Sequence, residues 1–137
     1  MSNPLAINKH ALDQEWEDQS SLAYDAAQDA AGAQLAMDQA KDALAVCEAD
    51  LDALVRKHPL NYGLLKATVD SIRATVTSHP ERVAAHEKYL EARHAYAIAQ
   101  AMVNAVEHKK RALTCLVDLH LSGYFAALPR RAAGVRP

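Results

Sequence analysis

The sequence predicts an all-α protein in which two long antiparallel helices, with a short helix at their connection, form a coiled-coil hairpin that assembles into an oligomer. Three observations lead to this prediction. Half of the 137 residues are apolar, yet aromatic residues make up only 5% of the chain. Apolar residues recur at alternating intervals of three and four, which is the pattern of a coiled-coil seam. Breaks that contain proline and glycine separate the periodic segments.

The first periodic segment predicts a helix over about residues 13–58. Pro59 and the following Asn61, Tyr62 and Gly63 end it, because the residue before a proline avoids the helical conformation. The residues of its expected seam are small or aliphatic: Ala26, Ala30, Ala33, Met37, Ala40, Leu44, Cys47, Leu51 and Leu54.

A short helix is predicted at about residues 66–77, followed by a second long helix that ends near Leu121, before Gly123. Ser78 and Glu81 have the spacing of a capping box, with Pro80 in the first turn, so we expect the second long helix to start there. Its expected seam consists of Tyr89, Ala92, Tyr96, Ala99, Val103, Val106, Lys110, Leu113, Val117 and His120.

The predicted organisation has three parts: an irregular N-terminal arm (residues 1–12), a helical hairpin domain (residues 13–122) and a basic C-terminal tail (residues 123–137). About forty helical residues at 1.5 Å each would form a rod of about 60 Å, and two such rods around a compact break imply an antiparallel pair. Because alanine-rich helices bury little apolar area, we expect much of the stability to come from helix pairing or oligomerisation.

Several classes of protein are not expected. No segment approaches about 20 continuous apolar residues, as a transmembrane helix requires, and the N-terminal residues MSNPLAINKH lack the pattern of a signal peptide. The two cysteines are expected to be small buried residues, and we expect a cytoplasmic protein. The histidines lack the i and i+4 pair of a helical zinc site, and no nucleophile lies beside an evident base, so neither a metal, a cofactor nor catalysis is expected.

Charge is divided unevenly along the chain. From Met1 to Val55, eleven acidic residues face two lysines, a net charge of −9; from Arg56 onward, thirteen Lys and Arg face six acids, a net charge of +7 that restores the total of −2. Such asymmetry indicates either pairing between the halves or a polyanionic partner. The residues that would contact a polyanion are Arg56, Lys57, Lys66, Arg73, Lys109, Lys110, Arg111, Arg130 and Arg131.

Two further expectations concern individual side chains near these cations. Lys110 falls on the predicted seam, so its side chain should either reach past the interface to water or meet an acid of the other helix. Tyr62, Tyr124 and Phe125 lie near cations and are candidates for stacking on unpaired bases.

The segments NYGLLKATVDSIRATV and VEHKKRALTCLVDLHLSGYF, the latter followed by PRR, resemble phage recombination mediators of the UvsY type. The resemblance covers the layout of roughly residues 13–130. It implies a non-enzymatic accessory protein in the host cytoplasm that forms rings of six or seven subunits and binds single-stranded DNA. It also implies that the protein helps a RecA-like recombinase to displace a single-strand-binding protein. The alternative is a phage coiled-coil interaction or assembly protein, such as a scaffold, a chaperone or an inhibitor of a host factor, without nucleic-acid binding.

Overall fold

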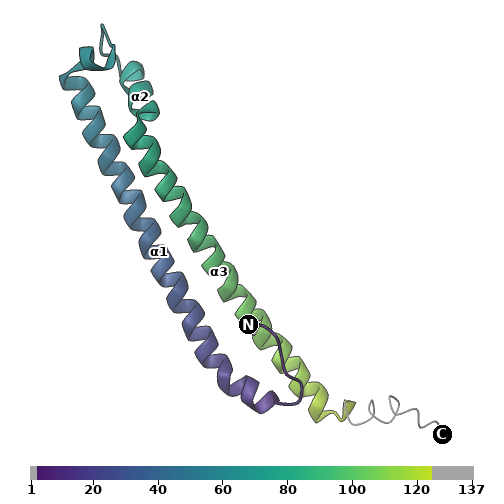
Figure 1. Ribbon diagram of the computed structural model, residues 1–137. Helices are drawn as coiled ribbons and strands as arrows, with labels where there is room; N and C mark the ends of the chain where they lie inside the picture. Colours follow the sequence, from purple (N-terminus) through teal and green to yellow (C-terminus); the bar gives the residue numbers. More distant parts are fainter. Residues whose placement is uncertain (1–2, 125–137) are drawn as a thin grey trace. The chain divides into compact units, whose positions relative to one another are not determined.

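The computed structural model describes residues 3–124, in which all regular structure is helical. The elements in chain order are α1 (Leu12–Lys57), a 3-10 turn η1 (Pro59–Tyr62), α2 (Val69–Ser78) and α3 (Pro80–Leu121). The prediction of an all-α chain with two long helices that pack together and a short one between them is confirmed within these residues (Figure 1). None of the helices in residues 3–124 is both long and apolar enough to cross a membrane.

The chain divides into two compact units, each built from a part of α1 and a part of α3. We call residues 30–99 the central unit, and residues 1–29 together with 100–137, of which 3–29 and 100–124 are described, the terminal unit. In the terminal unit Gln19 donates a hydrogen bond to the Val106 carbonyl (3.1 Å), while Glu15 meets Lys109 (2.9 Å). As the residue number increases along α1, the number of the α3 residue that it contacts decreases, so the two helices run antiparallel there.

The core of the central unit is a cluster of four buried aliphatic residues. Leu51 and Val55 come from α1, and Ile72 and Val76 come from α2. Val55 is fully buried whereas Leu54, which the heptad pattern placed on the seam, is 47% exposed. That prediction was wrong because α2 packs against the last turns of α1 and selects the face that carries Val55.

Helix α2 begins at Val69, three residues later than predicted, because Thr68 caps it. The Thr68 hydroxyl accepts a hydrogen bond from the Ser71 amide (3.2 Å), and the Ser71 hydroxyl accepts one from the Thr68 amide (2.9 Å). This reciprocal pair satisfies two amides that helical geometry leaves free.

The predicted capping box at Ser78 is wrong. The Ser78 hydroxyl instead donates back to the Ala74 carbonyl (2.9 Å) inside α2, which extends through Ser78. His79 has an extended backbone, as expected of a residue before proline, and its Nδ1 accepts a hydrogen bond from the Glu81 amide (3.2 Å). A single residue therefore separates α2 from α3.

The core of the terminal unit contains Ala26, Val106 and Leu113, together with the buried polar side chains of Gln19 and Lys109. Most of the predicted α3 seam is buried or half-buried, but Lys110 and His120 are exposed. The prediction that Lys110 lies on the seam is wrong, since its neighbour Lys109 takes the buried place.

Residues 3–11 precede α1 as irregular backbone that local hydrogen bonds hold in place. The Asn3 and Asn8 side chains accept bonds from the amides of Leu5 (2.9 Å) and His10 (3.0 Å). The Asn8 amide also donates to a Glu15 carboxylate oxygen (3.1 Å), which ties this arm to the first turn of α1.

Both cysteines are free thiols. Cys47 is half-buried and packs against the core of the central unit, whereas Cys115 is exposed, contrary to the expectation that both would be buried.

Candidate nucleic-acid interface

Four of the predicted cations flank the connection between α1 and α2 in the central unit. Arg56 and Lys57 end α1, Lys66 precedes α2, and Arg73 lies on α2. All four are exposed. Only Arg56 is paired, through its Nε, which donates to Asp52 at 2.6 Å on the same helix face. Within residues 3–124, the side chains of Lys57, Lys66 and Arg73 make neither an ion pair nor a hydrogen bond.

The groove beside this connection contains the carboxylates that could neutralise the charge of Arg73. The groove is open, has a volume of about 390 Å³, and its charged lining residues are Glu48, Asp52, Arg56 and Arg73. Asp52 is paired with Arg56, and Glu48 accepts a hydrogen bond from Arg82 (3.1 Å). Since each carboxylate already has a cation, Arg73 adds a charge that no groove acid compensates.

Tyr62, which the sequence made a candidate for base stacking, is instead a packing residue. It is half-buried, packs against the core of the central unit, and lies beside the His79 ring with the ring centroids 6.2 Å apart. Tyr124 is 49% exposed at the end of the described chain. Phe125 lies outside the described residues.

Three consecutive cations of α3, Lys109, Lys110 and Arg111, comprise one buried and two exposed side chains. Lys109 is only 8% exposed, and its ammonium lies 2.9 Å from a Glu15 carboxylate oxygen and 2.9 Å from the Pro4 carbonyl oxygen. Lys110 and Arg111 are exposed. A DNA strand could reach Lys109 only after the arm and Glu15 had moved, so Lys109 is a structural cation and not a free phosphate contact.

Pairing with Lys109 lowers the pKa of Glu15. The hydrogen bond from Lys109 is the largest cause that lowers the pKa of the carboxyl, and the Asn8 amide and the charge of Lys109 lower it further. Burial acts in the opposite direction but is outweighed. Glu15 is therefore held ionised as the fixed counter-ion of Lys109.

The remaining predicted site residues, Arg130 and Arg131, lie outside the described residues. In the described part of the chain, no group of three or more His, Cys, Asp or Glu side chains gathers as a metal site would require.

Sequence reasoning missed two features of the terminal unit. In the sequence Glu15 is one of many acids, and only the structure shows that it contacts the arm and pairs with Lys109. Trp16 lines a pocket near the end of α3, and its being the single tryptophan was the one available signal.

Comparison with known proteins gives no relative: no family model, curated protein or solved structure matches the chain.

Proposed function

We propose that the protein is a non-enzymatic, homo-oligomeric protein that binds single-stranded DNA as a recombination mediator, beside a RecA-like recombinase and a single-strand-binding protein. The observation that carries the proposal is the set of three exposed, unpaired cations, Lys57, Lys66 and Arg73, around the α1–α2 connection. The groove carboxylates are already paired with other cations, and the one acid of α2, Asp70, offsets only one of the three free charges, so this region keeps a net positive charge.

Phosphate binding of this kind does not need a shaped pocket. Each cation that neutralises a phosphate releases a counter-ion, and the affinity for single strands therefore falls with salt with a log–log slope of about −0.7 per contact. Long exposed lysine and arginine side chains suit this role, because they can follow a flexible backbone. The resemblance of the chain to UvsY-type mediators supports the same function.

The test compares two triple variants with equal loss of charge. The connection variant replaces Lys57, Lys66 and Arg73 by glutamine. The control variant replaces three other exposed cations of the central unit that also make no ion pair, namely Lys41, Lys88 and Arg93. Binding of a fluorescently labelled oligo-dT strand is measured by anisotropy between about 50 mM and 200 mM salt.

We expect wild type to bind at low salt and to weaken steeply as salt rises. The connection variant should lose about two units of the log–log slope, since three contacts at about 0.7 each disappear. The control variant should keep the wild-type slope. Absence of binding at about 50 mM salt, or equal losses in both variants, would contradict the proposal.

A second candidate, a coiled-coil interaction or assembly protein without nucleic-acid binding, is favoured by one observation. Leu35 and Val46 are 59% and 60% exposed on α1, and Leu90 and Ile98 are 44% and 59% exposed on α3, all within the central unit. At 100° per residue, Leu35 and Val46 lie on the side of α1 opposite to the buried Leu51. Such a second apolar face is typical of a helix that pairs on two sides.

Light scattering with and without oligo-dT distinguishes the two candidates. Replacing Leu35 and Val46 by glutamine should lower the solution mass under either candidate. If wild type assembles but its mass is unchanged when oligo-dT is added, the interaction protein without nucleic-acid binding is the better description.

A further inference from the structure

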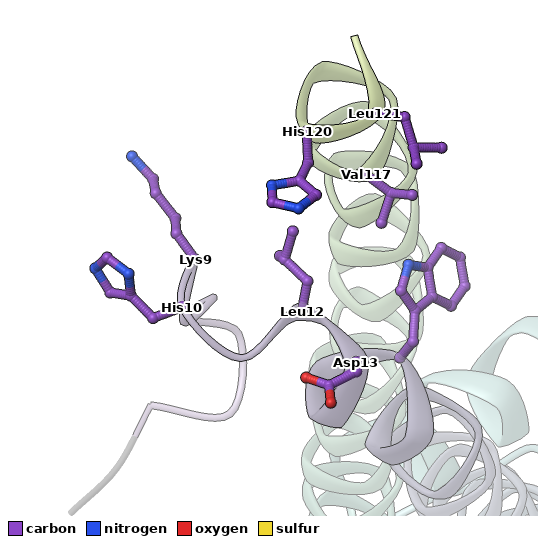
Figure 2. A pocket seen from close by; sticks show the side chains of 8 residues that line it. Lys9, His10, Leu12, Asp13, Val117, His120 and Leu121 are labelled. Carbon is purple, nitrogen blue, oxygen red and sulfur yellow. The ribbon is translucent and has the colours of Figure 1, made fainter. Parts of the chain in front are cut away.

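An open pocket of about 380 Å³ lies in the terminal unit, where the turn before α1, the first turns of α1 and the last turns of α3 meet (Figure 2). Its apolar wall is formed by Leu12 and Trp16 of α1 with Val117 and Leu121 of α3. The volume is within the range of about 300–1,000 Å³ that small-molecule sites occupy.

Polar side chains line the rest of the pocket, and those of Lys9 and His10 point outward from the turn before α1 (Figure 2). Lys9 and His10 come from the turn before α1, Asp13 from its first turn, and His120 from the end of α3 (Figure 2). Within residues 3–124, none of these four side chains makes an ion pair or a hydrogen bond. The pocket therefore offers polar groups that the fold itself does not use.

Trp16 gives the pocket an exposed aromatic surface. The residue remains 36% exposed although indole is the largest apolar side chain, and it is the single tryptophan of the chain. An aromatic face that is open to solvent in a pocket that a lysine also lines suits an unpaired nucleotide, since every base has a π-face and every nucleotide a phosphate.

We propose that this pocket binds one unstacked nucleotide of a DNA single strand, with the base against Trp16 and the phosphate at the rim near Lys9 and His10. The proposal deepens the function proposed above and rests on it. Leu12 and Val117 would cover the aliphatic side of the base site. The carboxylate of Asp13 repels a phosphate but can accept a hydrogen bond from a base amino or ring N–H group, so the base enters the pocket and the phosphate stays outside it.

The pocket and the connection cations belong to different units of the chain. The connection cations lie in the central unit, whereas Lys9, His10 and Trp16 lie in the terminal unit. Contacts at the connection are electrostatic and depend on salt, while stacking on Trp16 depends on the presence of a base. The two contributions can therefore be measured separately.

The single tryptophan makes the experiment direct, because all of the indole fluorescence comes from Trp16. Wild-type protein is titrated with oligo-dT and with an abasic oligonucleotide of the same length, which has the phosphates but no bases. Anisotropy of labelled oligo-dT is then measured for Trp16→Leu, Trp16→Phe and the matched control Tyr24→Leu. Tyr24 is an exposed aromatic residue of α1 in the same unit but does not line the pocket.

We expect oligo-dT to quench the fluorescence of Trp16 and the abasic strand to leave it unchanged. Trp16→Leu should weaken oligo-dT binding by about 5- to 160-fold, the range for loss of one stacked base. Trp16→Phe, which keeps an aromatic face, should recover most of that affinity, and Tyr24→Leu should bind as wild type does. Equal quenching by both strands, or unchanged affinity of Trp16→Leu, would overturn the inference.

The outcomes separate the pocket from the proposed function. If oligo-dT binds and the connection variant weakens it while Trp16→Leu does not, the function stands and the pocket is not part of it. If oligo-dT does not bind wild type at all, the function fails. The pocket is then judged by thymidine monophosphate alone: saturable quenching of Trp16 supports a nucleotide site, and its absence ends the inference. Since the wild-type titration needs no substitution, a variant that failed to fold would not remove the test.

Discussion

The pair between Lys109 and Glu15 offers the sharpest test of how the terminal unit is held together. The perturbations are Glu15→Gln, Lys109→Met and the double variant. Glutamine keeps the size of Glu15 without its charge, and methionine keeps most of the aliphatic stem of Lys109. The side chains of Lys109 and Glu15 are 7% and 17% exposed, and their charged atoms lie 2.9 Å apart.

The magnitude follows from this burial and from the partners that each substitution leaves behind. Exposed ion pairs contribute about 0–1 kcal/mol, while removing one partner of a fully buried pair costs about 3–5 kcal/mol. Glu15→Gln leaves the more buried ammonium with only the Pro4 carbonyl as a full acceptor, so we expect a cost of about 2–3 kcal/mol. Lys109→Met leaves a carboxylate that is more exposed and keeps the Asn8 amide, so about 1–2 kcal/mol is expected.

The assay is urea unfolding at neutral pH, followed by circular dichroism, for the wild type and the three variants. In the double variant neither charge is left unpaired, so its cost should be close to that of Glu15→Gln alone. The resulting coupling free energy is about 1–2 kcal/mol, within the range for residues in contact. Additive costs, with a coupling below about 0.5 kcal/mol, would refute the conclusion that the two charges stabilise the fold as a pair.

Three other predictions test further parts of the fold. Because the folded state lowers the pKa of Glu15, the carboxylate stabilises the fold fully above its unfolded pKa of about 4.5, and this contribution is lost as the pH falls through the folded pKa. The difference in unfolding free energy between wild type and Glu15→Gln should therefore be constant near neutral pH and shrink as the pH falls below about 4.5. Ile72→Ala should cost about 2–5 kcal/mol in the same urea assay, because the side chain is 2% exposed, whereas Leu65→Ala, at 97% exposure, should cost less than about 0.5 kcal/mol. Gly63 has a left-handed φ of 74° and open space where a Cβ would lie, so Gly63→Ala should cost about 1 kcal/mol through the backbone alone and Gly63→Asn should cost less, which thermal unfolding can resolve.

Much of the fold could be predicted from the sequence because its signals are local. Alternating three- and four-residue spacing and the position of Pro59 placed the ends of α1 within one residue. Which of Lys109 and Lys110 is buried could not be predicted in this way. The two side chains point 100° apart around the helix, and contacts with the arm determine which of them is buried. Pro4 supplies the carbonyl oxygen that the buried lysine contacts, and the Asn8 amide holds the Glu15 carboxylate in place.

The difference between local signals and contacts between distant segments also explains how much of the candidate site could be predicted. The sequence identified the cations of the connection, since a residue type can be read directly. It did not indicate which of them keep a free charge, because that depends on pairs between distant segments, such as Arg82 with Glu48 across 34 positions. The pocket at Trp16 likewise needs residues from both ends of the chain, and no local pattern brings Val117 near Leu12.

The proposed oligomer and the proposed DNA binding depend on each other for a physical reason. One chain offers three free cations at its connection, and three phosphate contacts give only weak binding at physiological salt. Several chains that hold one strand raise the effective concentration of each further contact without any new chemistry. Substitution of Leu35 and Val46, which carry no charge, should therefore weaken oligo-dT binding together with assembly, and most strongly for strands long enough to span several subunits. If the mass falls while the affinity for long strands is unchanged, each subunit binds DNA by itself and the apolar face of α1 has another use.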